Sequence, residues 1–304
     1  MHDPQPEFRP HAGQPEALDP LVRRILAPNP SPMTYRGTNT YLVGTRGIAV
    51  IDPGPEDPAH LTAILAALQP GQSITHILVT HAHRDHSPLS RELSRVTGAP
   101  ILAYGDAFAG RSPAMQALAL RGLVGGGEGV DTAFAPDQCL PDKAIVHGDG
   151  WEIEALHTPG HFGNHLSFGM GRTLFSGDVV MGWASSLVSP PDGDLAAFMT
   201  SLERLATGRW GVFLPGHGAP ISDPVDRCAN LLAHRRAREA SILKELQNGA
   251  ATAATLASRI YVDTPEALLP AATRNVFAHL IALTDRAQAR PEAELSENAM
   301  FSVC

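Results

Sequence analysis

The sequence predicts an α/β fold, and three observations lead to it. From about residue 48 to residue 104, apolar β-branched runs alternate with amphipathic segments in the order strand, helix, strand, helix, strand. Hydrophobic residues make up 43% of the 304, which is enough for a sizeable core. A chain of this length accommodates one large α/β domain and a small appendix.

The N-terminal part is expected to begin with an extended arm. Residues 1–20 contain five prolines, which favours an extended, mobile segment. Residues 21–26 are expected to form the first strand, and residues 39–43 and 48–52 a hairpin, because a Gly-Thr-Arg-Gly turn joins them. Residues 58–69 place leucine and isoleucine at helical spacing, so we expect a helix against the sheet.

The next strand leads into an unusual concentration of ligand-type side chains. After the apolar run of residues 74–80, the segment His81-Ala-His-Arg-Asp-His86 places three imidazoles and a carboxylate within six positions. Ser87 and Pro88 then begin a helix. The histidines therefore lie in a turn at the carboxyl end of a strand, where open α/β sheets place their ligands.

This turn predicts a metal site. Neutral imidazole and carboxylate together suit zinc and related first-row ions. His81 and His83 can point to one side of the turn while Asp85 and His86 point to the other, so one segment can serve two neighbouring ions. A polar surface turn is the alternative, but these residues are unfavourable in a core and unusual together on a surface.

Four further positions repeat one pattern, in which an apolar, strand-like run ends near a glycine and a histidine or aspartate. Glycine allows the sharp turn and the close backbone approach that ligand loops need. Singly, each is equally well explained as an ordinary loop residue; together with residues 81–86 they indicate one site. The four are Asp52, His161, Asp178 and His217.

The H-x-H-x-D-H motif and the order of these segments resemble the metallo-β-lactamase superfamily over roughly residues 20–222. The resemblance implies an αββα sandwich with a two-metal site on its open edge. It also implies that Asp52 orients a ligand histidine. The implied ligands are His81, His83 and His161 for one zinc, Asp85, His86 and His217 for the second, and Asp178 as the bridging carboxylate.

The order of motifs and the C-terminal segment most resemble the β-lactamase-like protein 2 group, which includes an endoribonuclease that cuts single-stranded RNA. The resemblance implies a catalytic domain at residues 21–222 after the arm of residues 1–20. A small helical, winged-helix-like domain would follow at residues 223–290, and residues 291–304 would form a frayed tail.

The helical pattern that begins the C-terminal domain is rich in arginine, including Arg227, Arg235, Arg236 and Arg238. These side chains could guide an RNA backbone toward the metals. The alternative is a packing or dimer-forming appendix whose arginines are solvated, because a charge run is usually a solvated face.

Other segments leave more than one interpretation open. Residues 105–136 interrupt the alternation, either as an excursion over the metal edge that sets substrate choice or as a solvated insertion. Trp183 could stack on a base, cover an apolar acyl group or simply pack. His147 and His157 are expected to be structural, and His165 to support the site rather than to bind metal.

Composition and charge limit the expected partners and the expected cellular compartment. The formal net charge of −8 does not favour broad attraction to a polyanion. An apolar run long enough to span a membrane is missing from the sequence, and residues 1–10 do not follow a signal pattern. The three cysteines, Cys139, Cys228 and Cys304, fit reduced thiols in the cytoplasm, and we assign them no metal role.

The chemistry expected follows from the metals. Two dications bridged by Asp178 can hold a hydroxide that is nucleophilic near neutral pH and can polarise a carbonyl or phosphoryl oxygen. Zinc, two ions per chain, is the expected cofactor, and the ligand set also accepts manganese or iron. Asp85 and Asp178 are the carboxylates expected to act in catalysis; no general acid is assigned.

Three functions remain open at this stage. The first is an endoribonuclease or phosphodiesterase acting on single-stranded RNA, as the C-terminal resemblance implies. The second is a hydrolase of a small ester, thioester, lactone or β-lactam, which the acidic charge and the scarcity of lysine favour. The third is a non-catalytic module; a structural zinc needs only four ligands, so seven argue against it.

Overall fold

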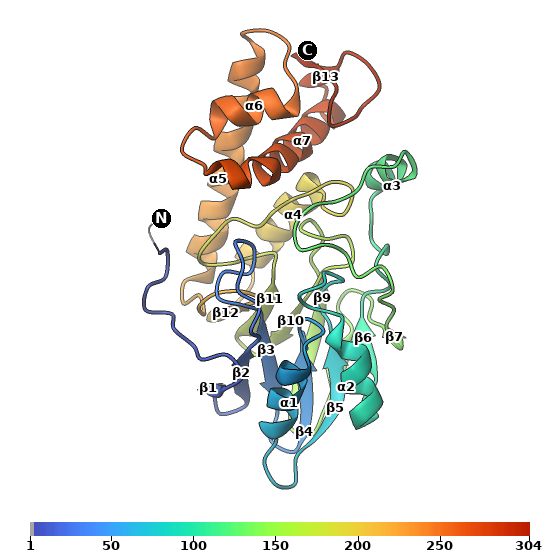
Figure 1. Ribbon diagram of the computed structural model, residues 1–304, viewed down its shortest axis with the longest axis vertical. Helices are drawn as coiled ribbons and strands as arrows, with labels where there is room; N and C mark the ends of the chain where they lie inside the picture. Colours follow the sequence, from blue (N-terminus) through green and yellow to red (C-terminus); the bar gives the residue numbers. More distant parts are fainter. Residues whose placement is uncertain (1–2) are drawn as a thin grey trace.

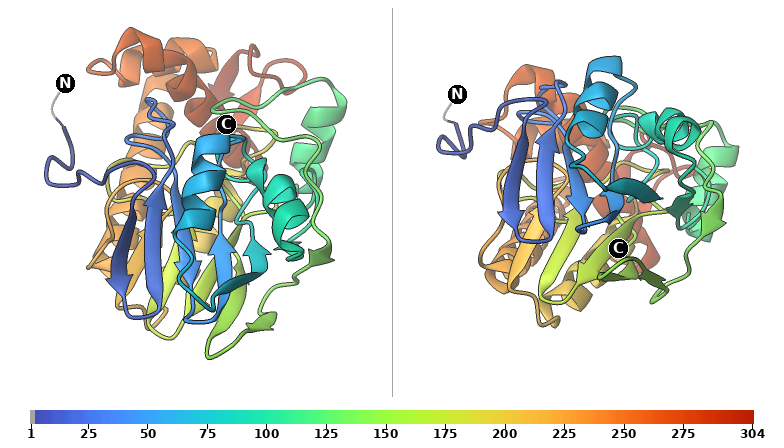
Figure 2. Two further views of the ribbon diagram at one scale, coloured as in Figure 1. Left: turned by 60° about the horizontal axis from the view of Figure 1, so that its bottom comes forward. Right: turned by 90° about the horizontal axis from the view of Figure 1, so that it is seen from below.

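The computed structural model describes residues 3–304 and contains two β-sheets packed face to face (Figures 1 and 2). The first sheet has the strand order β1 (Pro15–Asp19), β2 (Val22–Leu26), β3 (Asn39–Val43), β4 (Gly47–Ile51), β5 (Ser73–Leu78), β6 (Ile101–Ala103) and β7 (Gln138–Cys139). The second has the order β12 (Val212–Pro215), β11 (Thr173–Gly177), β10 (Leu166–Met170), β9 (Glu152–His157) and β8 (Ile145–His147).

Helices cover the outer face of each sheet. Helices α1 (Pro58–Ala66) and α2 (Leu89–Thr97) pack on the first sheet, through Ile64 and Leu93 among others. Helices α4 (Leu195–Ala206) and α5 (Pro224–Leu246) cover the second sheet and share its outer core. The layers are therefore helix, sheet, sheet, helix, and the predicted αββα sandwich is confirmed.

The alternation of side chains along each strand explains why both faces of the first sheet are apolar. In β4, Ile48 and Val50 face the helices, whereas Ala49 and Ile51 face the second sheet. The second sheet contributes Phe168 to the same central layer. Strands buried on both faces read as continuous apolar runs, as β4 does.

The strand directions bring several strand ends to one edge. Strands β4, β5 and β6 are parallel neighbours in the first sheet, and β11 and β12 are parallel in the second. The loops that leave these strands therefore meet at the edge of the sandwich that faces the C-terminal helices (Figure 1). This edge carries the motifs identified in the sequence.

The C-terminal part forms a second core of its own. It comprises the end of α5, α6 (Ala253–Ile260), a short 3₁₀ helix η1 (Glu266–Leu268), α7 (Leu269–Asp285) and the strand pair β13 (Ala289–Pro291) and β14 (Phe301–Val303). Helix α3 (Pro113–Leu120), from the insertion at residues 105–136, packs against this core through Met115 and Leu118. Helix α3 thus anchors the insertion to the C-terminal core, whereas most of residues 120–128 are exposed.

Two predictions about the chain ends are wrong. Residues 15–19 form β1 and pair with β2, so this part of the expected mobile arm belongs to the sheet. The tail is not frayed, because β14 pairs with β13 and the Phe301 side chain is fully buried against Phe277. The Phe301 ring, the buried Ala299 and a backbone ladder order this segment.

Within residues 3–304, none of the helices combines the length and the apolar character needed to cross a membrane.

A buried histidine in this fold makes stability depend on pH. His60 of α1 is 1% exposed and hydrogen-bonds through Nε2 to Thr40 Oγ1 at 2.8 Å, and burial lowers its pKa to about 4. The unfolded chain binds this proton near pH 6.5, so stability is complete above that pH and falls as the pH drops toward 4. We expect the free energy of unfolding to fall by about 2 kcal/mol between pH 7 and pH 5 from this group.

Urea unfolding at both pH values, with and without His60→Leu, measures this contribution. The variant is expected to lose less stability than the parent over the same interval. An equal loss in the two proteins would contradict the assignment.

Candidate metal centre

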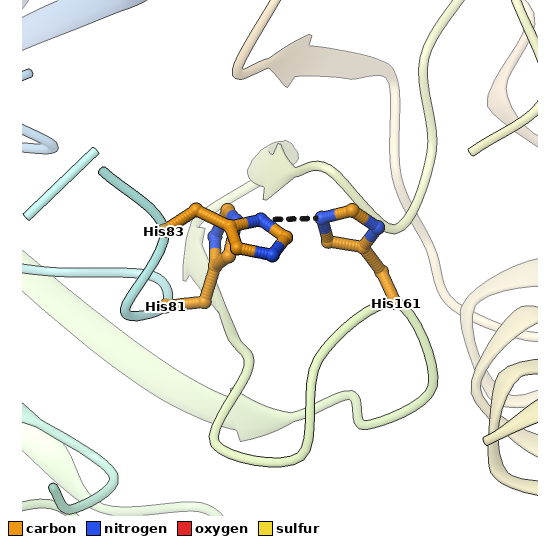
Figure 3. A group of neighbouring side chains, drawn as sticks. All are labelled: His81, His83 and His161. Atoms are coloured by element: carbon orange, nitrogen blue, oxygen red, sulfur yellow. Dashed lines mark hydrogen bonds between the residues drawn. The ribbon is translucent and has the colours of Figure 1, made fainter. Parts of the chain in front are cut away.

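Three imidazoles converge on one point at this edge. His81 and His83 lie in the loop after β5, and His161 lies in the loop after β9 (Figure 3). His83 Nδ1 is 2.9 Å from His81 Nε2 and 3.1 Å from His161 Nε2. All three side chains are buried, so these nitrogens form a compact group that can hold one metal ion.

Hydrogen bonds set which nitrogen of each ring faces the group. Thr80 Oγ1 donates to Asp52 Oδ2 at 2.7 Å and therefore accepts from His81 Nδ1 at 2.9 Å. His161 Nδ1 donates to the carbonyl oxygen of Leu187 at 2.7 Å. With both Nδ1 atoms protonated, the Nε2 atoms keep free lone pairs directed at the common point.

A second group lies beside the first and consists of Asp85, His86, Asp178 and His217, all buried. His217 Nε2 is 3.1 Å from Asp85 Oδ2 and 3.2 Å from His86 Nε2. The other ring nitrogens are again anchored: His86 Nδ1 donates to Asp52 Oδ2 at 2.9 Å, and His217 Nδ1 donates to the Gly37 carbonyl at 3.1 Å.

Asp178 lies between the two groups. Its Oδ2 atom is 3.3 Å from His217 Nε2 and 3.7 Å from His161 Nε2, so one carboxylate reaches both. The remaining oxygens, Asp178 Oδ1 and Asp85 Oδ1, are buried and have no hydrogen-bond partner within the described chain. Buried carboxylate oxygens without donors are costly unless a cation satisfies them, so this donor set fits two metal ions.

The protonation states of the first group also suit a metal. Burial lowers the pKa of His83 to about 3, and it lowers the pKa values of His81 and His161 as well. These rings are therefore neutral at pH 7, which is the form that binds metal ions.

The second group behaves differently because it contains carboxylates. Burial alone would lower the pKa of His217, but Asp178 and Asp85 raise it to about 10. Burial opposes the charged form of His86 too, yet Asp85, Asp178 and Asp52 raise its pKa well above the usual range. A metal ion that binds here must displace these protons, so its affinity should increase with pH.

A loop that precedes α4 supports both groups and is itself held by the C-terminal domain. Leu187 provides the carbonyl that anchors His161, and Ser186 Oγ donates to the Asp178 carbonyl. The buried guanidinium of Arg235, on α5, donates to the Ser186 carbonyl and to Asn275 Oδ1 of α7. Arg235 thus connects the C-terminal helices to the loop that positions the site.

A cavity of about 240 Å³ opens onto the metal centre. His83, Asp85, His161 and Asp178 form its floor, and Met33, Met181, Trp183 and Leu187 provide apolar walls. Tyr261, Leu268 and Ala272 close it from the C-terminal domain. Trp183 stacks on Tyr35 with ring centroids 5.0 Å apart, so it packs as a wall of the cavity.

The structure brings together all seven residues expected to bind metal, and Asp52 lies beneath them. His165 contacts the site from behind, since its Nε2 accepts from the Asp178 backbone N–H at 3.1 Å. His157 stacks on Tyr104 and His147 is exposed, so both lie outside the centre. Three features were not predicted from the sequence: the hydrogen-bonding role of Thr80, the buried position of Arg235 and the roof of the cavity. Hydroxyl hydrogen bonds and long-range packing leave no local spacing pattern in a sequence.

We expect Asp52→Asn to weaken metal binding by about 10- to 100-fold. Asp52 accepts from the Thr80 backbone N–H at Oδ1 and from Thr80 Oγ1 and His86 Nδ1 at Oδ2. Asparagine has one acceptor oxygen, so its NH₂ group would face a donor on one side, and the rings that these bonds orient would shift. Asn tolerates the left-handed backbone at residue 52, where φ is 50°, so folding should survive. Isothermal titration with Zn²⁺ measures the affinity; exposed Asp149→Asn is the control, and unchanged affinity in the first variant would refute the role.

Comparison with known proteins agrees with this geometry. Residues 33–217 match the metallo-β-lactamase superfamily, and residues 252–295 match the β-lactamase associated winged helix domain. A "β-lactamase-like protein 2 homolog" from Drosophila melanogaster is 32% identical over 300 residues, covering 92% of this chain and 93% of the relative. An "atrochrysone carboxyl ACP thioesterase" from Claviceps purpurea is 32% identical, covering 76% of this chain and 67% of the relative.

Among solved structures, a metallo-β-lactamase family protein from Thermus thermophilus superimposes with a TM-score of 0.76 at 25% identity, covering 95% of this chain and 100% of that one. The chain belongs to the metallo-β-lactamase superfamily and carries its associated winged-helix domain. It is a metal-dependent hydrolase of that superfamily, with a His and Asp donor set able to hold two ions.

Proposed function

We propose that this hydrolase cleaves a small ester or thioester with a largely apolar acyl group. The observation that carries the proposal is the cavity above the metal centre, whose walls and roof are mostly apolar. Its volume of about 240 Å³ suits a short acyl or aromatic group rather than a polymer. Roof residues Tyr261 and Leu268 come from the winged-helix domain, so this domain would select the substrate.

We propose the seven clustered residues as the ligands of two ions, with zinc the first choice and manganese or iron as alternatives. Such a pair supplies Lewis acidity toward a carbonyl oxygen and an activated water. In the chain itself, Asp85 and Asp178 place negative charge where the ions would sit. The anchored Nδ1 atoms of His81, His86, His161 and His217 fix the rings, and the apolar cavity wall excludes bulk water from the reacting bond.

The arginines of α5 support a small substrate over RNA. Arg227 donates to the Met181 carbonyl at 2.7 Å, Arg236 pairs with Glu203 at 3.1 Å, and Arg238 donates to the Ile260 carbonyl at 3.2 Å. Buried Arg235 and half-buried Arg227 and Arg238 serve internal contacts, and exposed Arg236 is paired, so along the described helix α5 these four cations do not form a free basic stripe. Single-stranded RNA remains the second candidate, on the resemblance to the β-lactamase-like protein 2 group.

The thioesterase name of the Claviceps purpurea relative supports the proposed reaction class. We further propose residues 21–222 as the catalytic domain, extended by the edge strand β1, and residues 223–290 as the helical domain, completed by the β13–β14 pair. A cytoplasmic location is proposed as well, supported by the unpaired state of all three cysteines among the described residues. Light scattering on the same samples tests a further proposal, that the chain forms a homodimer.

A substrate panel tests the proposal. Zinc-loaded protein is assayed against an aromatic acyl thioester, a lactone, a β-lactam and a single-stranded RNA oligonucleotide. We expect the thioester to turn over fastest. Leu268→Glu should raise KM for it by about tenfold or more, because the charge would be desolvated in an apolar roof. The same change at Leu120, which is 89% exposed, should have no effect. If the RNA were cleaved while the thioester stayed intact, the proposed small substrate would be wrong and RNA would become the first candidate.

A further inference from the structure

A second pocket lies among the helices α4, α5 and α7. It has a volume of about 480 Å³. Leu195, Met199 and Ala282 form an apolar side, and two basic residues, Arg235 and His279, are buried in its wall. None of its lining residues lines the cavity over the metals, so the two spaces are separate.

Arg235 is a buried cation that lacks a counter-ion. The residue is 2% exposed, and its terminal nitrogens donate to Asn275 Oδ1 and to the Ser186 carbonyl. Its guanidinium also lies 5.1 Å from the centre of the Phe198 ring. Both hydrogen-bond acceptors are neutral oxygens rather than carboxylates, and within residues 3–304 the Arg235 Nε has no hydrogen-bond partner. Buried charges are normally paired, so this site favours an anion.

His279 adds two further unsatisfied atoms to the same wall. The side chain is 1% exposed, and neither Nδ1 nor Nε2 has a hydrogen-bond partner anywhere in the described chain. Burial, with a contribution from the Arg235 charge, lowers the pKa of His279 to about 3, so the ring is neutral. A neutral imidazole always carries one N–H, which can donate to an anion. Buried polar groups are normally hydrogen-bonded, and a ligand would satisfy this one.

The rim of the pocket does not cancel the positive charge inside. Arg236 pairs with Glu203, and Arg286 pairs with Glu239, so these charges are mutually balanced. Asp285 is exposed, where water and salt screen it. The wall of the pocket therefore holds one uncompensated cation and one imidazole, both buried, beside an apolar surface.

We propose that this pocket binds a small aliphatic carboxylate, with its carboxylate group at Arg235 and His279 and its chain against Leu195, Met199 and Ala282. A carboxylate accepts several donors at once and would neutralise the buried guanidinium. The apolar side distinguishes this ligand from a purely polar anion such as phosphate, which would leave those side chains uncovered.

Hexanoate is the probe, with hexanol and inorganic phosphate as comparison compounds, on the zinc-loaded full chain. Hexanoate should shift the His279 ring signal in a saturable NMR titration. At ten times its Kd it should raise Tm by about 3 °C. His279→Leu should abolish this rise and should itself fold, since it removes two unsatisfied nitrogens. His234→Leu, at an exposed position of α5, should behave like the parent.

Hexanoate could also bind at the metal centre through its carboxylate. The His83→Ala variant, which lacks one of the proposed metal ligands, should still show the shift of the His279 ring signal. The proposal is overturned if His279 does not respond to hexanoate, or if His279→Leu is stabilised as much as the parent. It is equally overturned if phosphate binds at His279 and hexanoate does not, because the apolar side would then play no part.

Discussion

Replacing Asp178 by asparagine is expected to reduce hydrolysis by about a hundredfold to a thousandfold, because the amide cannot neutralise cations on both sides. The Asp178 Oδ2 atom lies 3.3 Å from His217 Nε2 and 3.7 Å from His161 Nε2, so both groups lose a shared negative ligand. Bound metal should fall below two ions per chain. Initial rates on the best substrate of the panel and metal analysis by plasma spectrometry measure the two effects.

The matched control for this experiment is Asp226→Asn, which makes the same change at an exposed position of α5. It should leave the rate and the metal content unchanged. If Asp178→Asn retained full activity with full metal content, a bridging role for Asp178 could not stand.

Gly160→Ala is expected to destabilise the fold by about 3 kcal/mol and to displace His161. Gly160 has φ of 137°, which is strained for any other residue, and a Cβ there would lie 2.2 Å from the Cα of Phe198 in α4. Because that neighbour is helix backbone, it cannot rotate away, and the loop that carries His161, the adjacent proposed ligand, must move. Urea unfolding and zinc titration report the two consequences.

Gly249→Ala separates strain from collision. Gly249 has a similar φ of 133°, but a Cβ there meets nothing within 4 Å. We expect this variant to lose only the strain energy, about 1 kcal/mol, and to bind zinc normally. Equal losses in the two variants would show that the contact with α4 is unimportant.

The part of the site that was predictable from sequence is the part encoded locally. His81, His83, Asp85 and His86 lie in one turn, so their spacing alone indicates how they divide between two ions. His161 and Asp178 are distant in sequence, but they could be recognised as candidate ligands because each follows a strand and is next to a glycine. Residue type, strand end and turn chemistry agree at all these positions, and the structure brings the side chains together.

The contacts between the two domains could not be predicted in this way. The arginines of α5 form a charge run in sequence, but the helix pattern does not reveal which of them face another element. Arg235 is buried against Ser186 and Asn275, residues that lie 49 and 40 positions away. Phe301 orders the C-terminal tail through packing that only the tertiary structure creates. Long-range packing of single residues leaves no periodic signal in the sequence.

Anomalous X-ray diffraction from crystals of the zinc-loaded protein, recorded above and below the zinc edge, tests the two-ion centre most directly. We predict two anomalous peaks, one among His81, His83 and His161 and the other among Asp85, His86 and His217, with Asp178 contacting both. Peaks at other side chains only, or a fully active protein without any peak at this edge of the sandwich, would contradict it.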